Sequence, residues 1–208
     1  MTRKIQRQIK KEIKAYGIKV LLSPHHAIRQ LKQQFRPSSH GNRFWWSSWL
    51  LMDYFKHNRL PEGSRILEIG CGWGLLSIYC AKKHKAITTG ADIDRNVLPY
   101  GMLHAEINRV NVDFIQKGFE QLRKKDLEKY DVILGADICF WDNMTYLLKN
   151  LILRAKKAGV KQVYISDPVR SPFESLCEYF NEKRGGEVLD WTANQPREIL
   201  GQILKISL

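Results

Sequence analysis

Glycines concentrate in one short loop, residues 68–74, which also carries an acidic side chain. Glu68 is followed by Gly70, Gly72 and Gly74 at every second position. Glycine lets the backbone turn sharply and approach a ligand without a Cβ atom in the way. Because a helical pattern begins directly after the loop, free N–H groups and the positive end of a helix dipole are expected there. This loop is predicted to bind the polar or anionic part of a ligand.

The spacing of this loop departs from that of dinucleotide-binding proteins. Its glycines follow the pattern GxGxG rather than GxGxxG, and an acid stands two positions before the first of them. A second acid, Asp92, ends the next apolar run, 24 residues after Glu68. Rossmann-like sites place there the carboxylate that accepts hydrogen bonds from ribose hydroxyls. Asp94 is the competing choice, and we assign it to capping the following helix.

A third acid, Asp137, follows the fourth apolar run and is soon followed by Phe140 and Trp141. Open α/β sheets bind their ligands at the carboxyl ends of the strands. Asp137 is therefore expected where a second reactant meets the ligand of the glycine loop. The competing role for this residue is a structural cap of a helix or loop.

The pattern Glu-x-Gly-x-Gly-x-Gly between a strand and a helix resembles motif I of the class I S-adenosylmethionine-dependent methyltransferases. The resemblance implies a Rossmann-like domain that binds S-adenosylmethionine and releases S-adenosylhomocysteine. In these enzymes the acid acts indirectly near the methionine amino group, the glycines pass under the ribose and methionine part, and a loop after the third strand flanks the adenine. Carried onto this chain, the resemblance implies these cofactor-binding residues: Trp45, Glu68, Gly70, Cys71, Gly72, Gly74, Asp92, Ile93, Gly118, Phe119 and Ala136.

A narrower resemblance links the chain to the seven-β-strand protein-lysine methyltransferases. That group acts on Hsp70-type chaperones, valosin-containing protein and the electron-transfer flavoprotein β-subunit. Asp137 and Phe140 are similar to its Asp-x-x-Tyr motif, with Phe in place of Tyr. The segment from Asp167 to Arg170, Asp-Pro-Val-Arg, resembles the Asp-Pro-Gly-Arg of the bacterial flavoprotein-type members. These two residues are expected to pair with each other or to shape the acceptor entrance, and the competing role is a structural turn with a surface arginine.

The same group carries a tryptophan-led helix before motif I, and this chain has an aromatic stretch at 44–57. Counting back from Tyr54 places the tryptophan that covers the cofactor at Trp45. Trp46 and Trp49 fit the same pattern in a shifted register.

The resemblance implies methyl transfer to a lysine amine, with Asp137 and Phe140 as the catalytic candidates. Asp137 would hold the amine through a charge-assisted hydrogen bond. Phe140 and Trp141 would form a partly apolar pocket, which disfavours the ammonium form and lowers the pKa of the lysine. The Asn/Asp-Pro-Pro-aromatic signature of amino-methylating DNA and RNA enzymes is absent from the sequence.

From residue 65 onward, β-branched runs alternate with helical stretches, which predicts a parallel sheet with helices on both faces. The last two strands have no helix between them and are expected to pair as a hairpin. We therefore expect an α/β fold: a Rossmann-like seven-stranded, mostly parallel sheet with an antiparallel last strand. The expected strands are 65–70, 86–92, 112–116, 130–136, 162–166, 187–192 and 199–206, and the expected helices are 44–57, 75–83, 96–109, 144–158 and 172–183.

Residues 1–42 are predicted to form a basic helical extension, and residues 43–208 the methyltransferase domain. Residues 1–36 hold ten Lys and Arg residues against one acid, so they carry +9 of the net charge of +13. The expected helices of the extension are 3–16, from the spacing of Ile5, Ile9, Ile13 and Tyr16, and a second one opened by Ser23 and Pro24 that runs to about Phe35.

Lysine methylation of a protein is the first functional hypothesis, with the basic extension docking on an acidic patch of the substrate. RNA is a second possible partner, because clustered Lys and Arg are typical of RNA-binding proteins. Two further hypotheses are N-methylation of a small molecule and a methyltransferase fold used only for binding. The four cysteines lack metal-ligand spacing and are expected to be reduced thiols in the cytoplasm. Neither a metal site nor a membrane span is expected.

Overall fold

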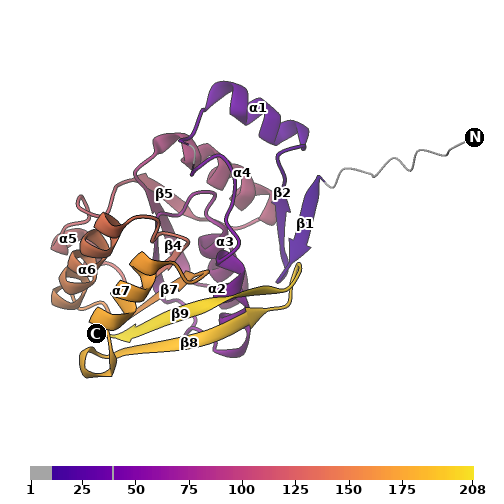
Figure 1. Cartoon of the computed structure of the whole chain (residues 1–208). Helices are drawn as coiled ribbons and strands as arrows, with labels where there is room; N and C mark the ends of the chain where they lie inside the picture. The colour runs from indigo at the N-terminus through magenta and orange to yellow at the C-terminus, as the bar shows by residue number, and fades with distance from the viewer. Residues whose placement is uncertain (1–10, 39) are drawn as a thin grey trace, which may run out of the picture.

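A seven-stranded sheet forms the centre of the molecule in a computed structural model that describes residues 11–38 and 40–208 (Figure 1). The order of the strands across the sheet is β5-β4-β3-β6-β7-β9-β8. The strands are β3 (Arg65–Ile69), β4 (Ile87–Asp92), β5 (Asp113–Gln116), β6 (Val132–Ala136), β7 (Gln162–Asp167), β8 (Gly186–Ala193) and β9 (Ile199–Ser207).

The directions of the strands confirm the predicted fold. The first five strands of the sheet in chain order, β3 to β7, pair in parallel. The last strand, β9, runs antiparallel to both β7 and β8, and it forms the expected hairpin with β8. It lies inside the sheet, so that β8 forms the edge.

Helices cover both faces of the sheet (Figure 1). Two apolar cores lie on opposite faces of the sheet. The first lies between the sheet and the helices before residue 110, and the second lies between the sheet and the helices after that residue. The helices of the first face are α2 (Ser48–His57), α3 (Leu75–His84) and α4 (Leu98–Asn108), and those of the second are α5 (Lys124–Leu127), α6 (Asp142–Lys157) and α7 (Ser171–Tyr179). Two 3₁₀ turns, η1 (Arg95–Val97) and η2 (Glu182–Arg184), complete the elements of this region.

The prediction of an amphipathic helix over residues 3–16 is wrong for residues 11–16. Residues 3–10 lie outside the described residues. Instead, β1 (Glu12–Ala15) and β2 (Ile18–Leu21) form an antiparallel hairpin. Tyr16 and Gly17 make its turn with φ values of +50° and +77°. Successive side chains of a strand point to opposite faces, and Ile13 and Ala15 are buried whereas Lys14 is exposed.

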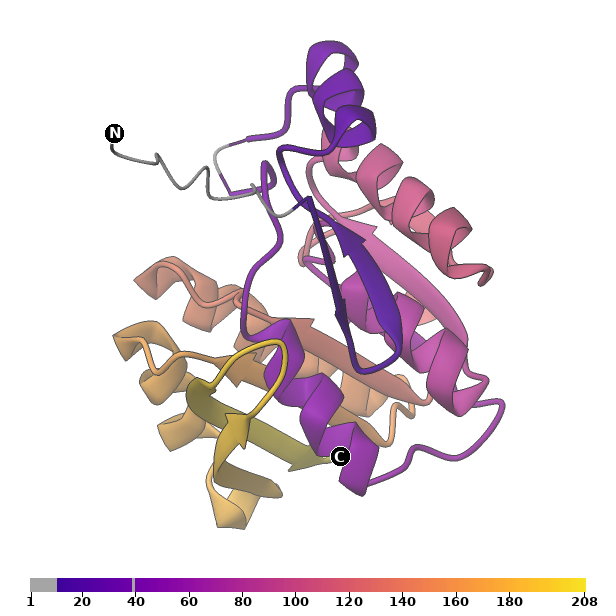
Figure 2. The same ribbon diagram turned by 90° about the vertical axis from the view of Figure 1, so that its right-hand side faces the viewer.

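This hairpin packs across α3 and α4 (Figure 2). Its β-branched side chains join the first apolar core. The Lys19 N–H donates to Oδ1 of Asn108 at 2.8 Å, and the Leu21 N–H donates to Nε2 of His104 at 3.0 Å. The proposed boundary between residues 42 and 43 stays a prediction, since the described part of the extension shares its core with the sheet domain.

The two other early helices are shorter than predicted. The helix α1 (His26–Gln34) is capped by His25, whose ring accepts the Ala27 N–H, so Ser23 is not its N-cap. The helix α2 begins at Ser48 rather than near Phe44. Trp45 therefore lies in the segment that leads into α2.

Candidate functional site

The carboxyl ends of β3, β4 and β6 open into a cavity of about 440 Å³. This is the edge of the sheet at which parallel α/β folds bind ligands, and the volume suits a cofactor-sized molecule. Ten of the thirteen residues predicted for the site line this cavity: Trp45, Gly70, Gly72, Asp92, Ile93, Gly118, Phe119, Ala136, Asp137 and Phe140. The three that do not are Glu68, Cys71 and Gly74.

Three glycines of the loop after β3 have positive φ values, and they differ in what surrounds them. At Gly72, with φ +50°, an added Cβ atom would meet nothing within 4 Å, so its backbone faces open space. At Gly74, with φ +68°, the same atom would lie 2.5 Å from Cε1 of Phe114. Gly74 thus permits close packing inside the fold, whereas Gly72 exposes the backbone to a ligand.

Glu68 and Cys71 are both buried beneath the loop. Oε2 of Glu68 accepts the N–H of Ser77, in the first turn of α3, at 2.8 Å. Burial raises the pKa of Glu68 to about 7, because the ionised form has lost its water. Burial also raises the pKa of the Cys71 thiol, whose sulfur lies 3.8 Å from the Gly72 carbonyl oxygen. Both side chains support the loop from within, and any action of Glu68 on a ligand would be indirect.

Asp92 ends β4 and holds the glycine loop in place. Its Oδ2 accepts the Gly72 N–H and its Oδ1 accepts the Asp94 N–H, each at 2.9 Å. Burial raises the pKa of this carboxyl group. The capping role assigned to Asp94 is confirmed, since its side chain accepts the N–H of Asn96 at the start of η1. Asp92 still lines the cavity, so its predicted contact with ribose hydroxyls stays a prediction.

An apolar slot lies beside Asp92. Ile93 is 70% exposed although its side chain is aliphatic. A Cβ atom on Gly118 would lie 3.1 Å from Cδ1 of Ile93, so the two residues are in close contact. Phe119 lines the same part of the cavity. A flat, apolar ligand group suits this slot, which agrees with the predicted place of adenine.

Asp137 lies at the end of β6 with a left-handed φ of +55° and is 4% exposed. Its Oδ2 accepts the Ser47 N–H at 2.8 Å, and its Oδ1 accepts a guanidinium N–H of Arg170 at 2.7 Å. Arg170 also donates to Oδ2 of Asp167 at 2.7 Å, which confirms the expected pairing of these two residues. Burial, partly offset by Arg170, raises the pKa of Asp167 to about 6. Both oxygens of Asp137 therefore already accept a hydrogen bond from the protein.

Four aromatic rings gather at the mouth of the cavity, and we call them the aromatic cluster: His40, Trp45, Phe140 and Trp141. The ring centroids of His40 and Phe140 are 4.6 Å apart, and those of Trp45 and Phe140 are 5.1 Å apart. The indole N–H of Trp45 donates to the His40 carbonyl at 2.7 Å.

Of the three tryptophans considered for the site, the structure places only Trp45 at the cavity, and its contact with a cofactor stays a prediction. Trp45 lines the cavity, whereas Trp49 is fully buried and Trp46 stacks under Arg197 at 4.0 Å. From the sequence, His40 could reach the site from the loop before the aromatic stretch, but a single histidine in a loop carries no local signal of where the loop will fold, so it was not among the predicted site residues. Ser47 was missed because it contacts Asp137 through its backbone N–H, which every residue except proline carries.

Within residues 11–38 and 40–208, no three histidine, cysteine or acidic side chains gather as a metal ion would require. The four cysteines are free thiols. No helix of that same part of the chain is both long and apolar enough to cross a membrane.

Comparison with known proteins links the sheet and its cavity to methyl transfer. Residues 66–159 match the family model described as "Methyltransferase domain". Ubiquinone biosynthesis O-methyltransferase of Coxiella burnetii is 34% identical over 87 residues, which cover 42% of this chain and 36% of that protein. Ribosomal protein L11 methyltransferase of a Caulobacter species is 30% identical over 130 residues, which cover 56% and 45%. The chain thus spans less than half the length of these curated relatives.

Solved structures share the fold. The human methyltransferase 10 domain containing protein superposes with a TM-score of 0.60 at 16% identity, over 87% of this chain and 95% of that one. An RNA methyltransferase from Salinibacter ruber, solved with S-adenosyl-L-homocysteine, gives 0.54 at 14% identity, over 74% and 87%. Residues 66–159 are thus similar to a methyltransferase domain, and the solved structures show that the sheet and its helices have the fold of such domains.

Proposed function

We propose, on the premise that residues 66–159 form a class I methyltransferase domain, that the whole protein transfers a methyl group from S-adenosylmethionine to the side-chain amine of a protein lysine. The observation that carries the proposal is that the exposed backbone of the glycine loop and the aromatic cluster share one cavity. A donor molecule and an acceptor side chain would therefore meet inside it.

The residues present fit the cofactor. The open backbone at Gly72 suits its methionine and ribose part, Asp92 suits the ribose hydroxyls, and the slot of Ile93, Gly118 and Phe119 suits the adenine. When bound, S-adenosylmethionine supplies an activated methyl group. The protein then has mainly to position the acceptor and to exclude water.

The aromatic cluster is the proposed acceptor channel, because its ring faces attract cations. Arg43 lies 4.5 Å from the ring centroid of Trp45, and Arg170 lies 4.5 Å from that of Phe140. A lysine side chain entering between the rings would make the same kind of contact. Loss of water inside the channel acts in the opposite direction, because it disfavours the charged ammonium, lowers the pKa of the lysine and so favours release of its proton to solvent before transfer.

Asp137 acts in this proposal as a positioning residue, which revises its expected role as the direct holder of the amine. Its carboxylate ties Ser47, just before α2, to Arg170, just before α7. The guanidinium of Arg170 in turn packs on Phe140. This chain of contacts fixes the ring that forms one wall of the acceptor channel.

A protein acceptor is supported by the name of one relative, which acts on ribosomal protein L11. The basic extension is the part of the chain that we propose docks the substrate protein, through an acidic surface. Its residues 1–10 lie outside the described residues. Localisation in the cytoplasm stays a prediction.

RNA is the second candidate acceptor. It is favoured by the net charge of +13 and by the likeness to the Salinibacter RNA methyltransferase. In this case the aromatic cluster would stack on a base rather than enclose an amine. Binding of the substrate would then weaken steeply as the salt concentration rises.

The test has two stages. Calorimetric titration with S-adenosylmethionine and S-adenosylhomocysteine should give micromolar binding, which the Gly72→Val and Asp92→Ala variants should lose. Incubation with methyl-labelled cofactor and a cell lysate should then label material that protease removes and ribonuclease does not. Label that only ribonuclease removes would make RNA the acceptor. A folded protein that binds neither cofactor form would overturn the methyltransferase proposal itself.

A further inference from the structure

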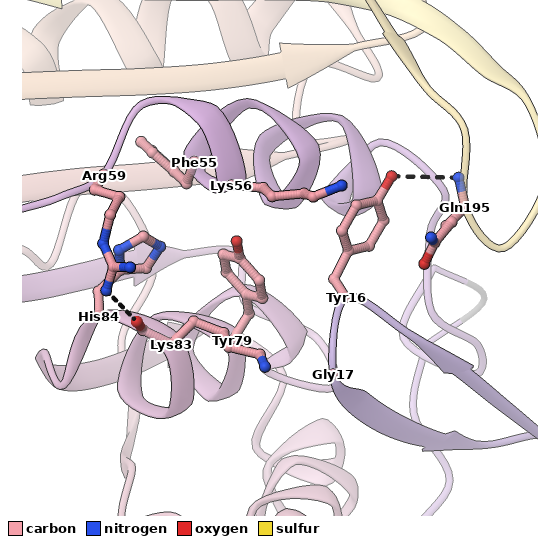
Figure 3. Close-up of a pocket in the computed structure, with 9 residues that line it drawn as sticks. All are labelled: Tyr16, Gly17, Phe55, Lys56, Arg59, Tyr79, Lys83, His84 and Gln195. Carbon is pink, nitrogen blue, oxygen red and sulfur yellow. Dashed lines mark hydrogen bonds between the residues drawn. The ribbon is translucent and has the colours of Figure 1, made fainter.

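A second cavity, of about 270 Å³, lies beside the amino ends of the parallel strands, opposite to the cavity of the glycine loop. Figure 3 shows the side chains that line it. It is formed where α2 and α3 end, and the hairpin turn at Gly17 and the β8–β9 connection at Gln195 close it. It shares no residue with the cavity of the glycine loop. We call it the basic pocket, and its other lining residues are Tyr16, Phe55, Lys56, Arg59, Tyr79, Lys83 and His84.

Three cations line the basic pocket: Lys56, Arg59 and Lys83. None of the described residues that line it is acidic, and none of the three cations forms an ion pair within the described chain. Arg59 donates one hydrogen bond, to the Lys83 carbonyl at 3.2 Å. Cations at the C-terminal end of a helix often only balance the helix dipole, because that end is equivalent to roughly half a negative charge.

The dipoles of the two helices neutralise only part of the positive charge of the basic pocket. The ends of α2 and α3 together supply about one negative charge. The carboxylate behind Tyr16, Asp53, supplies a second, and it already accepts hydrogen bonds from Tyr16 and Trp191. Three cations exceed these two, so the pocket keeps a positive balance.

His84 gives an independent sign of a missing partner. The residue is 3% exposed, and neither of its ring nitrogens has a hydrogen-bond partner among residues 11–38 and 40–208. A buried polar group left without a partner destabilises a fold, and such groups are rare in proteins. Burial, and then the charge of Arg59, lower the pKa of His84, so the ring is neutral at pH 7 and has one N–H to donate.

Tyr79 adds a further donor. Its hydroxyl points into the space between α2 and α3, with Arg59 and His84 on one side and Lys56 on the other (Figure 3). Burial raises the pKa of Tyr79, so the phenol keeps its proton. The pocket thus combines three cations with two neutral donors, and a group with several acceptor oxygens matches them.

We propose that the basic pocket binds a phosphate group. Four oxygens in a tetrahedron satisfy more of these donors than the two oxygens of a carboxylate, and Arg and Lys are the side chains that recognise phosphate in proteins. The group belongs either to a small phosphorylated compound or to the backbone of a nucleic acid. The site is separate from the methyl-transfer cavity, so it stands or falls independently of the function proposed above.

Calorimetric titration of the full chain with pyrophosphate, in 0.15 M sodium chloride, tests the proposal. The double variant Lys56→Ala/Arg59→Ala should weaken binding at least about tenfold, because charge-assisted hydrogen bonds are lost. Lys82→Ala is the matched control, since Lys82 is on α3 but does not line the pocket. Control and parent should bind pyrophosphate equally, and all three proteins should bind S-adenosylmethionine equally.

The His84→Phe variant separates binding from folding. A phenyl ring keeps the contacts with Phe55 and Tyr79 but has no nitrogen to satisfy. Thermal unfolding should therefore be unchanged or occur at higher temperature. Pyrophosphate affinity should fall about fivefold, since one hydrogen bond to the ligand is lost.

A short oligoribonucleotide distinguishes the two sources of phosphate. If it competes with pyrophosphate and loses affinity in the same variants, the source is a nucleic-acid backbone; if it does not compete, the source is a small compound. The proposal is overturned if the parent protein binds neither probe, or if the double variant binds as well as Lys82→Ala does.

Discussion

The carboxyl and amino ends of the parallel strands form two edges of the sheet, and the polar groups at these two edges differ in whether they have hydrogen-bond or ionic partners. At the carboxyl edge, the side chains of Glu68, Asp92 and Asp137 all accept hydrogen bonds from the protein itself. At the amino edge, the cations of the basic pocket have no acidic partners, and the ring nitrogens of His84 have no hydrogen-bond partner, within the described chain. The acids of the first edge thus have their hydrogen-bond partners before any ligand arrives, whereas the proposed phosphate would supply the partners that the second edge lacks. Substitutions at the two edges should therefore act on different properties.

The largest effect on the free energy of unfolding is expected at Gly74, where an added Cβ atom has no room, rather than at Gly72, where it would face open space. Gly74→Ala should lower the free energy of unfolding by about 3 kcal/mol, because it adds left-handed strain to a clash with Phe114. Gly72→Ala should cost only about 1 kcal/mol, since strain is the only cost there. Urea denaturation of both variants measures the difference, and equal losses would contradict the distinction between the two glycines.

Next in size is the loss of the contact between Asp137 and Arg170. Asp137→Ala should reduce kcat about 100-fold, on the order of 2.7 kcal/mol, while cofactor affinity stays within about threefold. Asp137→Asn should recover part of the rate, because an amide oxygen can still accept the Ser47 N–H. Single-turnover kinetics measures both. Full activity of the alanine variant would remove Asp137 from the proposal.

A smaller effect concerns the buried acid under the glycine loop. A carboxyl whose pKa is raised in the folded state, here to about 7, destabilises the fold above that pH. The penalty fades as the pH falls from 7 toward the unfolded value near 4.5. Glu68→Gln should thus raise the free energy of unfolding by about 2 kcal/mol at pH 8 and by little at pH 5. Denaturation at the two pH values tests this, and a variant less stable at pH 8 would show that the charged hydrogen bond to Ser77 outweighs burial.

The smallest effect on the free energy of unfolding is expected for Tyr16, which lines the basic pocket. Tyr16→Phe removes the donor to Oδ2 of Asp53, at 2.7 Å, and should lower the free energy of unfolding by about 1–2 kcal/mol. Cofactor affinity should not change, because Tyr16 does not line the cavity of the glycine loop. A loss of cofactor binding in a folded variant would show that the two edges are coupled.

The sheet could be predicted from the sequence because each buried strand is a short apolar run between turn residues, as at Arg65–Ile69. The ligand loop could be predicted because all its parts are adjacent in the chain. The hairpin could not, since Ile13 belongs both to an alternating pattern and to a helical spacing with Ile5 and Ile9. Packing against α3 and α4 selects the strand.

Parts of the site that depend on distant contacts were also beyond prediction. Glu68 and Gly74 satisfy the motif, but their surroundings show that they support the loop rather than line the cavity. The basic pocket draws Gly17, Lys56, Lys83 and Gln195 from four separate segments. No local spacing indicates such a site, because the fold alone brings those segments together.

The hydroxyl of Tyr16 accepts the N–H of Gln195 across 179 positions of the chain. During synthesis on the ribosome, the N-terminal hairpin therefore emerges early and must wait until residue 195 has been made before this contact can close. Non-local contacts of this kind form late, since the entropy of a long loop opposes them. The apolar side of the hairpin can pack on α3 and α4 once residue 108 has been made, so the contact with Gln195 is a late closure of a unit that has already packed.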